Sequence, residues 1–407
     1  MKQNEKLLLT SFIFTIFVVW LHAGEPLLSY VPGQVAVPGF FMLSGYLFMK
    51  GIPSDDAAAE KEAVRGKLKR RVNTLVIPYL LWNAIYFVIY LVTGRAQIGE
   101  IFEAVFLYRC NPVFWYMFQL ILITVLAPVI YYIMKKGRRA ALILLAAIFT
   151  LAVLYAKLPF HYCNEDALFY YCLGAYLSLV SSSERHPGAQ PFGPLFSRLF
   201  GALRKRGWFP ASHDQPHSEL EKPENDKPLH DSLPAASLPD DAQRGWIASC
   251  ASSAASFAAK RELSEAAEWR RSMVPPARCF AISAVIMAAF LLVRSVLPAE
   301  LRNISEAGYR AAGALAVYFL TDLVYEKKGG IEVRPWMKVN FFVYATHYMI
   351  IRIIWALETA AGLNGNQTAN VITYLMMPAI CIGTAYGLSV IMKKYVPKVY
   401  SVLTGGR

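Results

Sequence analysis

About ten apolar stretches follow one another along this 407-residue chain, separated by polar segments. They cover residues 7–23, 35–49, 72–92, 113–134, 140–155, 167–180, 280–296, 311–325, 339–360 and 371–392. A helix needs about 17 to 25 apolar residues to cross a hydrocarbon core of about 30 Å. Only 17% of the residues are charged, whereas a soluble domain averages roughly a quarter. We therefore expect an all-α fold, a polytopic transmembrane bundle of about ten helices.

Basic residues collect in alternate loops of this pattern. If the N-terminus is cytoplasmic, the inside segments hold Lys2, Lys6, Lys50, the run 65–71, Lys135, Lys136, Arg138, Arg139, Lys327, Lys328, Lys393, Lys394 and Lys398. Cytoplasmic loops of membrane proteins are enriched in Lys and Arg. The charges predict a multi-pass membrane protein with both termini in the cytoplasm. Residues 1–23 could alternatively form a signal peptide, but retaining them preserves the alternation of charge.

The membrane part is interrupted by residues 184–276, which hold many Pro, Ser and charged residues and no apolar span. Such a composition is typical of disorder. We expect residues 1–183 and 277–407 to form a single membrane domain, with this segment as a cytoplasmic insertion. The net charge of +13 reflects cytoplasmic loops, and no basic stripe with interleaved aromatics indicates nucleic acid as a partner. His213 and His217 lack a third ligand nearby, so we expect no metal site.

Five motifs are distributed over the membrane part. They are a His in Phe17-Val18-Val19-Trp20-Leu21-His22, the string Phe40-Phe41-Met42-Leu43-Ser44-Gly45-Tyr46-Leu47, the string Leu75-Val76-Ile77-Pro78-Tyr79-Leu80-Leu81-Trp82 after a basic run, Phe114-Trp115-Tyr116, and Phe342-Val343-Tyr344-Ala345-Thr346-His347. In this order and spacing they resemble acyltransferase family 3, membrane O-acyltransferases that modify bacterial cell-surface sugars and related acceptors. The chain departs from the family pattern at Ser11 and Thr74, where the family often has Arg.

This resemblance implies transfer of an acyl group, in particular acetyl, from cytoplasmic acyl-CoA (acetyl-CoA) to a hydroxyl of a cell-surface or lipid-linked carbohydrate. Acyl transfer needs a base or a nucleophilic carrier, and an imidazole can serve as either near neutral pH. His22 lies about 22 Å along the first stretch at 1.5 Å per residue, in the outer half of the bilayer. An ionisable group at that depth is by default a functional candidate. We expect His22 to be the catalytic base or acyl carrier, with His347 as an alternative or assisting base.

The donor would meet the basic run at the cytoplasmic start of the third stretch. Lys67, Arg70 and Arg71 can pair with the phosphates of coenzyme A, or they can serve as a topology signal that contacts anionic lipid. Ser44 and Gly45 lie on the second stretch, where a glycine permits close approach of the pantetheine arm or, alternatively, of another helix.

The remaining candidates concern the substrate cavity, which we expect Glu25, Trp115, Tyr116 and Arg352 to line. Glu25 could orient the imidazole of His22, although Gly24 and Pro26 indicate a loop there. The lipid bilayer and a carbohydrate or other hydroxyl acceptor are the expected partners. The alternative function is a membrane transporter or flippase for a polar metabolite or glycan precursor, since intramembrane His347 and Arg352 would also suit a transport path.

Overall fold

The computed structural model describes residues 2–24, 26–53, 56–154, 164–182, 275–298, 302–363 and 365–406, and these residues contain helices and no strand. The predicted insertion at 184–276 lies almost entirely outside the described residues.

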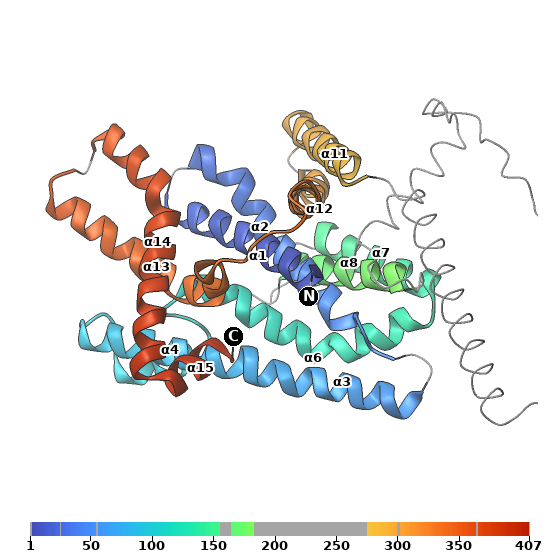
Figure 1. Cartoon of the computed structure of the whole chain (residues 1–407), viewed down its shortest axis with the longest axis horizontal. Helices are drawn as coiled ribbons and strands as arrows, with labels where there is room; N and C mark the ends of the chain where they lie inside the picture. The colour runs from blue at the N-terminus through green and yellow to red at the C-terminus, as the bar shows by residue number, and fades with distance from the viewer. Residues whose placement is uncertain are drawn as a thin grey trace, which may run out of the picture. The chain divides into compact units, whose positions relative to one another are not determined.

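A helix of the described residues overlaps every predicted apolar stretch (Figure 1). The long helices are α1 (Lys2–His22), α2 (Pro26–Met49), α3 (Ala57–Arg71), α4 (Ile77–Val92), α6 (Trp115–Lys135), α7 (Arg138–Leu154), α8 (Glu165–Ser182), α11 (Pro276–Val296), α12 (Arg302–Lys327), α13 (Asn340–Ala360) and α14 (Gln367–Tyr395). Two short helices are α5 (Ile101–Phe106) and α15 (Pro397–Thr404). The all-α bundle expected from the sequence is confirmed.

Seven helical segments of the described residues are long and apolar enough to span a membrane by length and composition. They are Glu5–His22, Val31–Met49, Ala57–Val92, Pro112–Lys135, Pro276–Val296, Pro335–Ala360 and Gln367–Tyr395. Helix α7 has only a shorter apolar part, and α12 carries Arg310 and Asp322 within its length. Fewer segments than the expected ten therefore satisfy these criteria, although the apolar helices together identify a membrane protein.

The predicted third stretch belongs to a longer helix. Helix α3 continues through the π-helical segment η1 (Val72–Val76) into α4, so the basic run 65–71 extends the spanning helix. Pro78 stands at the start of α4. A proline in a regular helix clashes with the carbonyl four residues earlier, and a π-helical turn relieves this contact.

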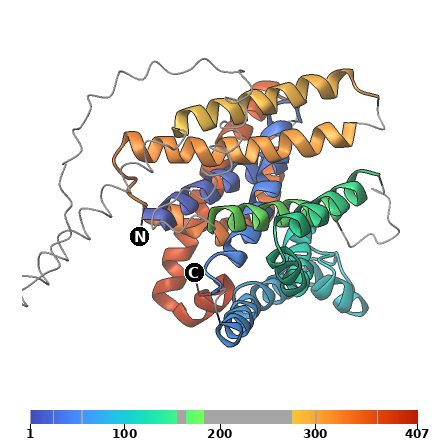
Figure 2. The same cartoon turned by 90° about the vertical axis from the view of Figure 1, so that its right-hand side faces the viewer.

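Helix α2 packs against α1, α8 and α12, which makes it the centre of the bundle. Its crossing with α8 depends on two glycines. A Cβ on Gly45 would overlap the carbonyl oxygen of Tyr171, and a Cβ on Gly174 would overlap that of Met42. Small residues allow helix backbones to approach this closely in membranes. Helices α11 and α12, yellow and orange in Figure 2, run side by side, and α11 exposes most of its remaining surface.

Candidate active site

The two candidate histidines lie next to each other. The ring centroids of His22 and His347 are 5.4 Å apart and the ring planes are inclined by 41°. His22 is the last residue of α1, because Gly24 has a φ of +104° that turns the chain toward Pro26 at the start of α2. His347 lies in the N-terminal half of α13 and is fully buried. The fold thus brings together the first and last motifs of the chain.

A single hydrogen bond fixes the protonation pattern of neutral His347. Its Nδ1 lies 2.7 Å from the carbonyl oxygen of Tyr344. A carbonyl only accepts hydrogen bonds, so Nδ1 carries the proton and Nε2 carries the lone pair. Nε2 is buried and has no hydrogen-bond partner among the described residues. Because a buried polar atom without a partner is costly, this nitrogen is a candidate acceptor for a proton from His22 or from a substrate.

Aromatic side chains connect the histidine pair to α6. Tyr344 lies 5.9 Å from both His347 and Tyr116 between ring centroids, and it stacks on Phe114 at 5.7 Å. Its hydroxyl donates a hydrogen bond to the carbonyl of Val113 over 2.7 Å. The Phe114-Trp115-Tyr116 motif is therefore packed against the motif that ends in His347. These contacts fix the position of α13 relative to α6.

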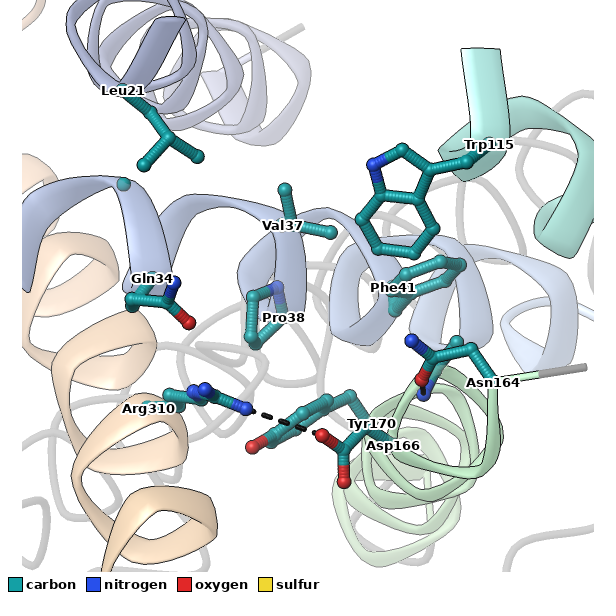
Figure 3. Close-up of a pocket in the computed structure, with 12 residues that line it drawn as sticks. Leu21, Gln34, Val37, Pro38, Phe41, Trp115, Asn164, Asp166, Tyr170 and Arg310 are labelled. Carbon is teal, nitrogen blue, oxygen red and sulfur yellow. Dashed lines mark hydrogen bonds and ion pairs between the residues drawn. The ribbon is translucent and has the colours of Figure 1, made fainter. Parts of the chain in front are cut away.

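A cavity of about 310 Å³ opens between α2, α6, α8 and α12 (Figure 3). Leu21, the neighbour of His22 on α1, lines it, as do Phe41 and Trp115. Arg310 and Asp166 complete the wall and form an ion pair at 3.1 Å, drawn as a dashed line in Figure 3. Trp115, one of the residues predicted to line the substrate cavity, lines this one. Asp166 and Arg310 were not among the predicted site residues, although charged residues next to apolar stretches were an available signal.

The other residues predicted to line a cavity lie elsewhere. Tyr116 packs between Phe41, at 4.7 Å, and Tyr344. Arg352 is exposed on α13 and does not share the burial of His347. Arg352 follows His347 by five residues, and at about 3.6 residues per turn two residues five positions apart do not lie on the same face of a helix. Glu25 lies outside the described residues, as do His213 and His217.

The predicted donor residues converge at the other end of α2. Arg71 donates a hydrogen bond to the hydroxyl of Ser44 over 2.9 Å. Lys67 donates to the carbonyls of Lys50, at 2.8 Å, and Leu47, at 3.2 Å, so it caps the C-terminal end of α2. Arg70 is exposed. Arg71 and Ser44 are brought together as a unit, whereas the ammonium of Lys67 is engaged in holding α3 against α2.

Gly45, grouped with these residues in the sequence analysis, is in contact with the backbone of α8. This is the close helix packing that we considered as the alternative to contact with the donor. The glycine determines where α2 and α8 cross, and it thereby positions Ser44 beside it.

The model of acyltransferase family 3, described as an acyltransferase domain, matches residues 12–203. The matched part contains His22, Ser44, Arg71 and Trp115, while His347 lies beyond it. No curated protein and no solved structure matches the chain. This match over residues 12–203, together with the apolar helices, supports a membrane acyltransferase.

Proposed function

We propose that this protein transfers an acetyl group from acetyl-CoA in the cytoplasm to a hydroxyl of a cell-surface or lipid-linked carbohydrate. The acyltransferase family supports group transfer in general. The acetyl donor and the carbohydrate acceptor rest on the resemblance of the motifs, and the orientation with both termini in the cytoplasm rests on the distribution of Lys and Arg. A plasma membrane of the bacterial type is the compartment that fits this orientation.

The pairing of His22 with His347 is the observation that carries this proposal. In one route, a ring nitrogen of His22 takes the proton of the acceptor hydroxyl while the oxygen attacks the thioester carbonyl. The carbon–sulfur bond then breaks, and the thiolate of coenzyme A takes the proton from the imidazolium.

In the second route His22 carries the acyl group. Its ring nitrogen attacks the thioester and releases the thiol of coenzyme A, and the acceptor hydroxyl then displaces the imidazole to form the ester. The unpaired Nε2 of His347 can take a proton from the His22 ring in either route, because it holds a lone pair and no other partner among the described residues. A buried base of this kind acts without competition from water.

The donor would lie along α2, with its phosphates near Arg71 and its thioester at His22. A guanidinium has five N–H donors, and Nη2 of Arg71 donates to the hydroxyl of Ser44 at 2.9 Å and to its carbonyl oxygen at 3.4 Å. The remaining donors of Arg71 can pair with phosphate oxygens. Exposed Arg70 adds charge at the same mouth. The long arm of acyl-CoA suits this arrangement because the two sites stand at opposite ends of the α2 helix.

The decisive experiment compares wild type, His22→Ala and Arg334→Ala at equal abundance in the membrane. Release of coenzyme A from acetyl-CoA and acetylation of surface carbohydrate are measured in the same membranes. We expect His22→Ala to abolish both signals and Arg334→Ala, an exposed residue, to preserve them. Full acetylation by His22→Ala would exclude His22 from the chemistry, and a deletion strain with unchanged acetylation would favour transport.

A further inference from the structure

The cavity lined by Leu21, Trp115, Asp166 and Arg310 opens at the same end of the bundle as His22. Leu21 directly precedes His22, and Asp166 belongs to the first turn of α8. Trp115 is the first residue of α6. In the expected topology these helix ends all face outward, on the side where an acceptor would arrive. The position of the cavity is therefore that of an acceptor site rather than a donor site.

Arg310, in the wall of this cavity, belongs to a chain of ion pairs among the described residues. Glu306 accepts from Arg310 at 2.9 Å and from Arg294 at 2.9 Å, and Arg310 also pairs with Asp166 at 3.1 Å. Among the described residues, two guanidinium groups thus face two carboxylates, and their sum is zero. An anionic ligand at Arg310 would meet the carboxylate of Asp166 as well. This arrangement disfavours an anionic ligand, because like charges at close range repel.

The same groups suit the hydroxyls of a neutral ligand. Asp166 has acceptor oxygens on a side chain that is 43% exposed. Arg310 supplies N–H donors, and its buried Nε has no hydrogen-bond partner among the described residues. Gln34 and Asn164 add amide groups to the wall. A hydroxyl both donates and accepts, so a ring with several hydroxyls can satisfy all of these groups at once.

Apolar and aromatic side chains complete the cavity. Trp115 and Phe41 have ring centroids 6.4 Å apart and lie on one side of it, opposite Arg310 (Figure 3). Their faces can cover the apolar C–H face of a sugar ring. The volume of about 310 Å³ is at the lower limit of roughly 300–1,000 Å³ for ligand pockets. It therefore fits one ring better than an extended chain.

We infer that this cavity is the acceptor site and that it selects an uncharged sugar ring, with Asp166 and Arg310 as the specificity-determining pair. The inference rests on the proposed function, since it assigns the acceptor of that reaction. Membership of the family does not determine the charge of the acceptor. We expect the paired charges of Asp166 and Arg310 to determine whether a neutral or a charged sugar binds. Among the described residues, removal of the Asp166 carboxylate would leave Glu306, which Arg294 shares, as the carboxylate paired with Arg310.

The test measures binding without any acyl donor. The full chain carries Gln34→Cys in the cavity wall, and the rate of its reaction with a maleimide is corrected for the native cysteines using wild type. The probes are the methyl β-glycosides of glucose, galactose, mannose and N-acetylglucosamine, and the corresponding uronates of glucose and galactose. A ligand at twice its dissociation constant should slow labelling about threefold.

We expect at least one neutral glycoside to protect the thiol and neither uronate to do so. In the Asp166→Asn background the order should invert, with a uronate protecting better than its neutral counterpart. Glu103→Gln, which removes an exposed carboxylate beside Arg109, should leave the order unchanged. An inverted order also shows that the Asp166→Asn protein is folded.

Three results would overturn the inference. They are equal protection by neutral and charged sugars, protection by none of the probes, and an order that Asp166→Asn does not alter. An unreactive Gln34→Cys would do the same, since the cavity would then be closed to ligands. Because no acyl donor is present, these results are independent of the His22→Ala assay. The binding test can therefore contradict the acceptor site without contradicting the proposed acyl transfer, and the His22→Ala assay can contradict the acyl transfer without contradicting the acceptor site.

Discussion

The guanidinium of Arg71 donates a hydrogen bond to the hydroxyl of Ser44 over 2.9 Å and so links the start of η1 to α2. The bond orients a half-buried cation at the point where the helix leaves its regular α-form. π-helical turns inside α-helices are frequent at functional sites. A phosphate that approached Arg71 would find its position already fixed by Ser44.

Arg71→Ala should therefore weaken donor binding. A hydrogen bond to a charged group contributes about 1.5–3 kcal/mol, which corresponds to an increase of about 10- to 100-fold in the KM for acetyl-CoA. The kcat should change little. Lys69→Ala, which removes an exposed charge from the same helix, is the control. Equal effects of the two substitutions would indicate general attraction of charge instead of a defined phosphate contact.

His347→Ala should lower kcat without a comparable change in either KM. Loss of a positioned acid or base typically costs about 10²- to 10⁴-fold in rate. His347→Gln keeps a polar side chain but has no ring nitrogen that can take up a proton near neutral pH. Tyr344→Phe removes only the hydroxyl that bonds Val113 and serves as the structural control. The measurement is steady-state kinetics on both variants at matched abundance. A kcat of His347→Ala equal to that of Tyr344→Phe would refute an assisting role for His347.

Gly45→Ala and Gly174→Ala should destabilise the bundle, because each added Cβ would overlap a carbonyl oxygen of the facing helix. Overpacking of this kind costs about 1–3 kcal/mol. Thermal unfolding of the purified protein should show a lower Tm for both variants. Gly383→Ala and Gly387→Ala on α14 provide matched controls, since no atom lies within 4 Å of the added Cβ. Tm values as high as those of the controls would mean that α2 and α8 do not cross as closely.

Lys6 and Asp322 form an ion pair in which the carboxylate side chain is fully buried. Lys6→Met should be strongly destabilising, by about 3–5 kcal/mol, because it leaves an unpaired buried charge. The double variant Lys6→Met with Asp322→Leu should recover much of this loss. Arg334→Ala breaks the exposed pair with Glu332 and should cost at most about 1 kcal/mol. Additive losses in the double variant would contradict the pairing.

The positions of the helices could be predicted from the sequence because hydropathy acts locally, and every predicted stretch is helical. The start of α3 at Ala57 could not be predicted in this way, because the many charged residues of α3 do not form an apolar stretch. His22 and His347 were each identifiable as buried ionisable candidates, but their contact depends on how α1 packs against α13. The pairing of Asp166 with Arg310 likewise depends on packing between distant helices, and no spacing in the sequence encodes it.

The orientation of the bundle is open to a direct test at two exposed positions. Glu103 on α5 and Lys69 on α3 lie on opposite sides of the membrane in the expected topology. A membrane-impermeant maleimide should label Glu103→Cys in intact cells and Lys69→Cys only after permeabilisation. Cys110, near Glu103, contributes little background because its thiol is buried. Burial also raises the pKa of the Cys110 thiol, which lowers the fraction of reactive thiolate. The reverse labelling pattern would place His22 on the cytoplasmic side, and acceptor and donor would then have to enter from the same compartment.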